Sequence, residues 1–142
     1  MTMQRISMPH PRRYPPRVTE FTRPFWEALG QGRFLVTRCQ SCRRHSFPPK
    51  PICPHCWTET IDWDEVATVG RLYSWTRVYA GPAIFESDLP YAIGIVDLDC
   101  GIRLGSPLLG EAAWHCGMEM ELVSVTYLDG PFFGARAKIE VA

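Results

Sequence analysis

The alternation of apolar and polar side chains predicts a chain built mainly from short strands. After residue 65 there are five alternating segments, separated by GPAIFESDLP, DCG, GEAAWHCG and LDGP, which carry the Gly, Pro and Asp that turns need. Five short strands favour a small closed barrel of the OB type, because a two-sheet sandwich usually has about seven. The segments are Arg71 to Tyr79, Tyr91 to Leu98, Ile102 to Leu109, Met118 to Tyr127 and Phe132 to Val141.

Residues 1–20 have no such alternation and form a basic arm. The stretch PHPRRYPPR is too broken by proline to hold a helix or a strand. Its arginines are Arg12, Arg13 and Arg17. We expect this arm to be flexible when the chain is alone.

A short helix is predicted over residues 21–32. Thr19 or Thr22 can cap it, Pro24 is tolerated in its first turn, and a glycine closes it. A helix this short is marginal by itself and must bury its apolar face against the chain or a partner. That face comprises Phe21, Phe25 and Leu29.

Four cysteines between residues 33 and 64 have the spacing of metal ligands. Cys39 and Cys42 form one Cys-X-X-Cys pair, and Cys53 and Cys56 form a second pair ten residues later. Each pair can wrap one side of a single ion, and four thiolates favour tetrahedral zinc, with iron as the alternative in the same geometry. A closed thiolate shell leaves no position for water or substrate, so we expect a structural ion rather than a catalytic one.

The other metal-binding and nucleophilic residues are interpreted as structural. His45 and His55 lie between the cysteines but are not needed as ligands, so we expect them at the surface or behind the ligands. Cys100 and Cys116 have no partner at metal spacing and are expected in the core or in turns. Residues 65–142 then follow as the barrel domain.

Charge is distributed unevenly along the chain. Residues 1–50 hold 10 of the 15 basic residues and only Glu20 and Glu27, which gives +8 and leaves −8 for the rest. This asymmetry indicates either an anionic ligand or partner near the N-terminal part, or two complementary surfaces within an oligomer.

The sequence contains no stretch approaching the roughly 18 apolar residues that a membrane span needs, and no apolar run follows its basic start. We therefore expect a cytoplasmic protein without membrane contact. In a reducing compartment, cysteines are more often metal ligands or free thiols than disulfides.

Beyond these patterns, the chain from about Phe25 to Val141 resembles a family of small acyl-CoA-associated proteins, long labelled a domain of unknown function. The resemblance rests on FWEALGQGRFLVTRCQSC, FPPKPICPHC, WDEVATVGRLYSWTRVY, LPYAIGIVDLDCGIRLGSPLLG and CGMEMELV, in this order. It implies a rubredoxin-like zinc ribbon over residues 33–64 joined to a five-stranded OB-fold.

The resemblance also implies a partner. Members of this family accompany thiolase-like enzymes or MaoC-type hydratases as accessory subunits, help to bind or pass acyl-CoA or stabilise the larger enzyme, and have no established catalytic residue. Only the four cysteines carry over securely. The basic arm departs from the short N-terminus that members commonly have, which leaves the transfer of their interface open.

Acyl-CoA binding has some support in the residues themselves. Coenzyme A needs a basic patch for its phosphates and an apolar groove for its thin pantetheine arm. Arg38, Arg43, Arg44 and Lys50 could supply the patch, and Phe25, Trp26 and Phe47 could wall the groove. The alternative is a solvated or partner-facing ribbon surface.

Two other functions remain as alternatives. Zinc ribbons and OB-folds also bind nucleic acids, and Tyr73, Trp75 and Tyr79 could stack bases, but the barrel segment is acidic. An independent enzyme is disfavoured because the sequence has no Gly-X-Ser-X-Gly, P-loop or dinucleotide fingerprint. Adjacent His115 and Cys116 would point to opposite faces of a strand, which places them poorly for proton transfer, although a turn would relax that objection.

Overall fold

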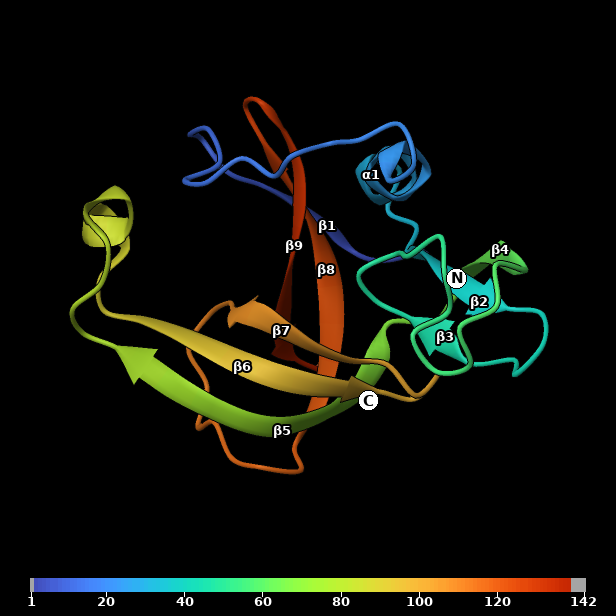
Figure 1. Ribbon diagram of the computed structural model, residues 1–142. Helices are drawn as coiled ribbons and strands as arrows, with labels where there is room; N and C mark the ends of the chain where they lie inside the picture. Colours follow the sequence, from blue (N-terminus) through green and yellow to red (C-terminus); the bar gives the residue numbers. More distant parts are fainter. Residues whose placement is uncertain (1, 139–142) are drawn as a thin grey trace.

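Two β-sheets, an α-helix and a 3-10 helix make up the described part of the chain, residues 2–138, in this computed structural model (Figure 1). The sheets have the strand orders β1-β8-β5-β6-β7-β9 and β3-β2-β4. The elements are β1 (Arg5–Ser7), α1 (Arg23–Gly30), β2 (Leu35–Cys39), β3 (His45–Ser46), β4 (Ile61–Glu65), β5 (Val69–Val78), η1 (Ala83–Asp88), β6 (Tyr91–Leu98), β7 (Arg103–Leu108), β8 (Glu119–Tyr127) and β9 (Gly130–Ala137).

The larger sheet closes into the predicted five-stranded barrel. β5, β6 and β7 form an antiparallel meander, and β8 and β9 form a hairpin. Two short contacts close the barrel: Leu108 pairs with Ala135 in parallel, and Val69–Arg71 pair with Glu119–Glu121. The connection between β5 and β6, at the far end of this meander, carries η1 (Figure 1).

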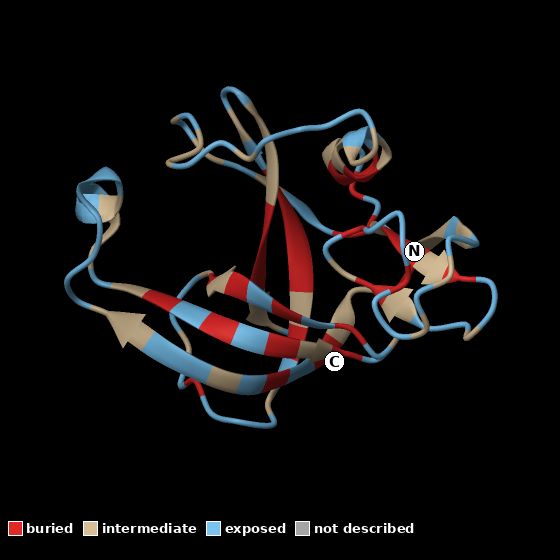
Figure 2. Ribbon diagram, viewed as in Figure 1, coloured by how far each residue is buried: buried red, intermediate tan, exposed pale blue. Residues whose placement is uncertain are grey.

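The ribbon and the barrel share one hydrophobic core. Phe34 and Val36 of the ribbon belong to the same buried cluster as Leu72 and Met120 of the barrel. The ring of Phe34 lies 5.9 Å from that of Phe133 on β9. Figure 2 shows this buried zone running from the barrel strands to β2. A common core holds the small ribbon against the larger domain.

Helix α1 packs against β8 and β9. Ser124 is fully buried and donates a 2.7 Å hydrogen bond from Oγ to the carbonyl oxygen of Leu29 near the end of the helix. Gly32 follows at φ +76, a left-handed conformation that glycine adopts without steric cost. Within residues 2–138, no helix has the length and apolar character needed to cross a membrane.

The N-terminal arm contains a strand that the sequence pattern did not predict. Arg5–Ser7 pair in parallel with Ser124–Thr126, and the N–H of Met3 donates a 2.7 Å hydrogen bond to the carbonyl oxygen of Gly32. Met3 is 5% exposed. The expectation of an arm without regular structure is therefore corrected for its first residues, where backbone pairing with an edge of the barrel takes over from side-chain pattern.

Candidate metal centre and neighbouring surfaces

The four predicted ligands converge at one end of the ribbon. Cys39 closes β2, Cys42 follows in the first turn, and Cys53 and Cys56 belong to a second turn before β4. Their Sγ atoms all lie within 4.8 Å of one another. Cys39 and Cys53 are buried, and the other two are half-buried.

The sulfur spacing fits a tetrahedral zinc ion. The Sγ atoms of Cys39 and Cys56 are 3.5 Å apart, and those of Cys42 and Cys53 are 3.6 Å apart. A zinc–sulfur distance of about 2.3 Å in a tetrahedron places sulfurs about 3.8 Å apart. The four side chains therefore form a closed cage for one ion without rearrangement of the backbone.

Both turns donate backbone N–H groups to the sulfurs. The N–H of Cys42 donates to Sγ of Cys39, and the N–H of His55 donates to Sγ of Cys53, each at 3.4 Å. Such bonds stabilise the thiolate form. In each turn the residue after the second cysteine, Arg43 or Trp57, adopts a left-handed conformation with φ near +65.

Thr58, which the sequence reading did not single out, lies against two ligands. Its Oγ1 is 3.2 Å from Sγ of both Cys39 and Cys56. This hydroxyl, followed by the N–H of Cys42, lowers the pKa of Cys39 to about 5. Its position two residues after the last cysteine is the only sequence signal for this role.

The thiols do not ionise equally in the absence of an ion. The backbone N–H of Arg44 lowers the pKa of Cys42, but burial and the neighbouring thiols outweigh it and raise that pKa to about 11. Several thiolates this close repel one another, so all four remain deprotonated together only around a cation. The donor set therefore fits zinc.

The histidines and remaining cysteines lie outside this cage. His45 Nε2 is 2.7 Å from a carboxylate oxygen of Asp64, so this ring links β3 to β4. Cys100 is half-buried and Cys116 is exposed. Among residues 2–138, the four-cysteine cluster is the only group of three or more His, Cys, Asp or Glu side chains placed to hold a metal.

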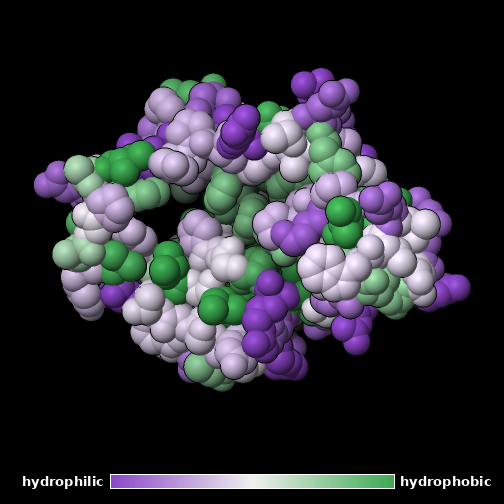
Figure 3. All heavy atoms as spheres, viewed as in Figure 1, coloured by the Kyte–Doolittle hydropathy of each residue, from purple (hydrophilic) through white to green (hydrophobic). Residues whose placement is uncertain are grey.

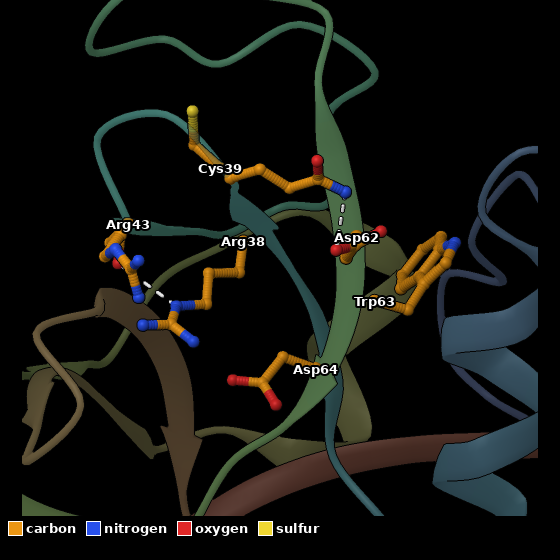
Figure 4. Close-up of a pocket in the computed structure, with 7 residues that line it drawn as sticks. Arg38, Cys39, Arg43, Asp62, Trp63 and Asp64 are labelled. Atoms are coloured by element: carbon orange, nitrogen blue, oxygen red, sulfur yellow. Dashed lines mark hydrogen bonds between the residues drawn. The ribbon is translucent and has the colours of Figure 1, made fainter.

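The predicted phosphate-binding cations are only partly gathered. Arg38 and Arg43 line a pocket of about 330 Å³ beside the cage, where Nε of Arg38 donates to the carbonyl oxygen of Arg43. Asp64 of β4 points toward Arg38 across the pocket, whereas Asp62, which also lines it, accepts a hydrogen bond from Gln40 (Figure 4). Arg44 and Lys50 are exposed elsewhere on the ribbon.

The predicted apolar walls lie in or against the core. Phe25 is only 2% exposed, and its ring lies 5.4 Å from Phe34 and 5.6 Å from Phe47. Trp26 is half-buried and stacks near Phe132 at 6.1 Å. A ring as buried as Phe25 cannot wall an open groove, so its role is in packing.

The aromatic stripe considered for nucleic-acid stacking is also divided. A bulge between Leu72 and Ser74 breaks the alternation of β5, and Trp75 pairs directly with Gly94. The guanidinium of Arg103 lies 3.7 Å above the ring of Tyr73 and occupies one of its faces.

A second hollow, larger than the pocket beside the cage, was not predicted. A groove of about 800 Å³ lies at the open end of the barrel, lined by the N-terminal arm, β5, η1, β6, β7 and the β8–β9 hairpin. Its sequence signals are dispersed, because its walls come from segments as far apart as residues 8 and 132.

A rubredoxin-like ribbon fused to an OB barrel defines the class of protein. Residues 26–62 match the family model described as the ChsH2 rubredoxin-like zinc ribbon domain, and residues 63–125 match the ChsH2 C-terminal OB-fold domain. The chain belongs to this ChsH2 family, as the residues that carried the resemblance predicted.

Three known proteins are similar to this chain. The benzoylsuccinyl-CoA thiolase subunit BbsA of Thauera aromatica is 31% identical over 118 residues, which cover 80% of this chain and 81% of that protein. A solved Ltp2-ChsH2(DUF35) aldolase has a chain with 29% identity and a TM-score of 0.75, covering 88% of this chain and 100% of that one. A probable enoyl-CoA hydratase alpha subunit of Thermomonospora curvata is 40% identical over 92 residues; these cover 62% of this chain but only 28% of that protein.

Proposed function

We propose that this chain is a non-catalytic accessory subunit of an acyl-CoA-handling enzyme, either a thiolase-like enzyme or a MaoC-type hydratase. The observation that carries this proposal is the near full-length likeness to BbsA, whose name makes it a thiolase subunit. The cage of four thiolates supports it, because such a site has no open coordination position for catalysis. The free thiols are consistent with a reducing cytoplasm.

Trp57 is our candidate anchor for the partner enzyme. Its side chain is 80% exposed, although its backbone has the left-handed conformation that costs a non-glycine residue about 1–2 kcal/mol. The turn around the metal cage fixes the backbone of Trp57, whose N–H donates to the carbonyl oxygen of Cys53, and exposed tryptophans are frequent anchors of protein interfaces. Trp57→Ala should therefore weaken the complex by about tenfold or more, whereas Tyr79→Ala, at another exposed aromatic residue, should not.

The exposed cations of the ribbon are our candidates for contacts with the phosphates of CoA. Arg43 and Arg44 are adjacent in the sequence, and both are exposed. The double reversal Arg43→Glu with Arg44→Glu should weaken CoA binding to the assembled complex. Arg17→Glu with Arg23→Glu makes the same charge change at exposed N-terminal positions and serves as its control. Equal CoA affinity in both variants would remove the ribbon from the ligand site.

Co-purification tests the function itself. The tagged chain is expressed in its native host, isolated at moderate salt, and analysed for bound proteins, nucleic acid and zinc. We expect a stoichiometric thiolase-like or hydratase-like protein and about one zinc per chain, with turnover of the partner reduced when the chain is removed. Co-purifying nucleic acid, or a chain that is active alone, would overturn the proposal.

A further inference from the structure

The groove at the open end of the barrel is lined on one side by β6 and β7, which carry the small residues Ala92, Gly94, Gly105 and Ser106 there. A Cβ on Gly94 would lie 2.9 Å from Leu72 and 3.0 Å from Leu108, so Gly94 points to the interior of the barrel. Ala92 lies two residues away on the same face, and Ser106 pairs directly with Gly94. Small barrels normally fill this space with side chains.

Aromatic side chains wall the groove beside these small residues. Trp75 pairs with Gly94 and therefore points to the same side, where it remains 39% exposed. Tyr127 and Phe132 line the opposite wall from β8 and β9, and Phe85 of η1 lines the far end. Figure 3 shows the hollow on the face in view, with apolar side chains along its margin.

The N-terminal arm crosses this groove as a strap. Arg12 is tied to the β8–β9 turn, where it donates from its backbone N–H and from Nε to Oδ1 of Asp129 at 2.8 and 3.3 Å. The next residue, Arg13, is tied to η1 by two hydrogen bonds to the carboxylate of Asp88. Two adjacent arginines thus join two separate hairpins across the open end of the barrel.

These pairs leave the groove without a free cation for an anionic ligand. Arg12 also donates from Nη1 to the carbonyl oxygen of Pro131 and from Nη2 to that of Asp129. Each guanidinium in the lining is therefore matched by a carboxylate. The phosphates of a nucleotide would find no unpaired positive charge here, whereas a neutral apolar group would lose nothing.

We propose that this groove binds a single apolar acyl chain whose polar carrier lies outside the groove. Its volume lies within the roughly 300–1,000 Å³ of small-molecule sites. An inserted peptide would bury backbone N–H and C=O groups against a mostly apolar lining, at a cost of about 1–3 kcal/mol for each unmade hydrogen bond. An alkyl chain has no such groups. The inference rests on the proposed function only for the source of the chain, an acyl thioester.

Displacement of a neutral fluorescent probe, N-phenyl-1-naphthylamine, from the full-length chain tests this inference. Butanoyl-, octanoyl- and dodecanoyl-CoA below their micellar concentrations, free CoA and dodecan-1-ol are the competitors. We expect affinity to rise with chain length by up to about fourfold per methylene, and free CoA not to compete. If dodecan-1-ol competes as well as dodecanoyl-CoA, the groove recognises the chain alone. Weaker competition by dodecan-1-ol would show an added contribution of the thioester carrier.

Two variants locate the binding site. Ala92→Leu fills the floor of the groove and should weaken dodecanoyl-CoA at least tenfold, while Ala113→Leu, in the exposed loop before β8, should leave it unchanged. Because Ala92→Leu could disturb packing, Trp75→Ala removes a wall instead and should also weaken binding. Melting curves show whether each variant is folded.

Displacement that is independent of chain length, or unchanged in both groove variants, would overturn the inference. Displacement of the probe by the purified partner enzyme but not by dodecanoyl-CoA would also overturn it and assign the groove to protein docking. Because binding is measured on the isolated chain, these outcomes are separate from failure of the accessory-subunit proposal, which is judged by co-purification.

Discussion

Arg13 and Asp88, 75 positions apart in the sequence, form a two-point ion pair in which Nε and Nη2 donate to the two carboxylate oxygens at 3.0 and 3.1 Å. This pair joins the N-terminal arm to η1, and with the neighbouring pair of Arg12 and Asp129 it holds the arm across the open end of the barrel.

Removing the carboxylate of Asp88 should release the arm without unfolding the barrel. Both partners are about one-third exposed, so Asp88→Asn should cost at most about 1 kcal/mol of unfolding free energy. Trypsin should then cleave the chain faster after Arg13 and Arg17. Glu86→Gln, at an exposed position of the same short helix, is the control and should leave the cleavage rate unchanged. Equal cleavage rates in both variants would argue against a strap held by this pair.

Loss of one metal ligand should unfold the ribbon. A structural zinc contributes on the order of 10 kcal/mol to folding of such a unit. Cys42→Ser should therefore lower both bound zinc, measured by elemental analysis, and the melting temperature. Cys116→Ser removes an exposed thiol outside the cage and should change neither. A Cys42→Ser protein with full zinc content and an unaltered melting curve would refute the structural role.

The turn position of Trp57 should prefer glycine for stability. Glycine adopts φ +66 without the steric cost that a Cβ brings, about 1–2 kcal/mol. We therefore expect Trp57→Gly to be about 1 kcal/mol more stable than Trp57→Ala in urea unfolding, the reverse of the order in a helix or a strand. Arg43→Gly and Arg43→Ala should show the same order in the other turn. If the alanine variant were more stable than the glycine variant, the prediction would be wrong, because the turn would have left the left-handed conformation.

Gly70 should be irreplaceable where β5 pairs with both β6 and β8. A Cβ added there would lie close against the backbone of Asp97, whose carbonyl oxygen cannot move without breaking the β5–β6 pairing. Gly70→Ala should cost about 2–4 kcal/mol of unfolding free energy. Gly105→Ala, where the nearest atom is 4.0 Å away, should stay within about 0.5 kcal/mol. Similar urea midpoints for both variants would contradict this reading.

The sequence was sufficient to predict the elements whose signals are local. The five barrel strands follow from alternation and turn residues, and the metal cage follows from two Cys-X-X-Cys pairs. Alternation failed on β8, where Leu122 to Val125 are all buried. Ser124, on the same face as Leu122, lies against the end of α1. The cover over Ser124 therefore comes from an element nearly 100 residues away.

Features set by pairing between distant residues could not be read from the sequence. β1 is three residues long and is defined by its partner β8, so it has no periodicity of its own. The bulge near Tyr73 turns Trp75 into the groove, which reverses the face that simple alternation assigns. The pairing of Arg12 with Asp129 spans 117 positions, and the sequence alone offers several equivalent acidic partners.

Acid should weaken the attachment of the arm in a way that depends on Asp129. The backbone N–H of Arg12, followed by its guanidinium charge, lowers the pKa of Asp129. A carboxyl whose pKa is lower in the folded state contributes stability above its unfolded pKa of about 3.9, and this contribution disappears as the pH falls through the folded value. The loss should therefore occur below about pH 4.

Urea unfolding at pH 7, 5, 4 and 3 measures this dependence. Asp129→Asn should be less stable than the parent chain at pH 7, and the difference should shrink toward zero as the parent protonates at low pH. Asp99→Asn removes the same charge from the exposed β6–β7 turn and controls for net charge. Release of zinc in acid affects all three proteins alike, so it cancels from the difference. A stability gap between the parent and Asp129→Asn that persists at pH 3 would show that the pair with Arg12 is not its source.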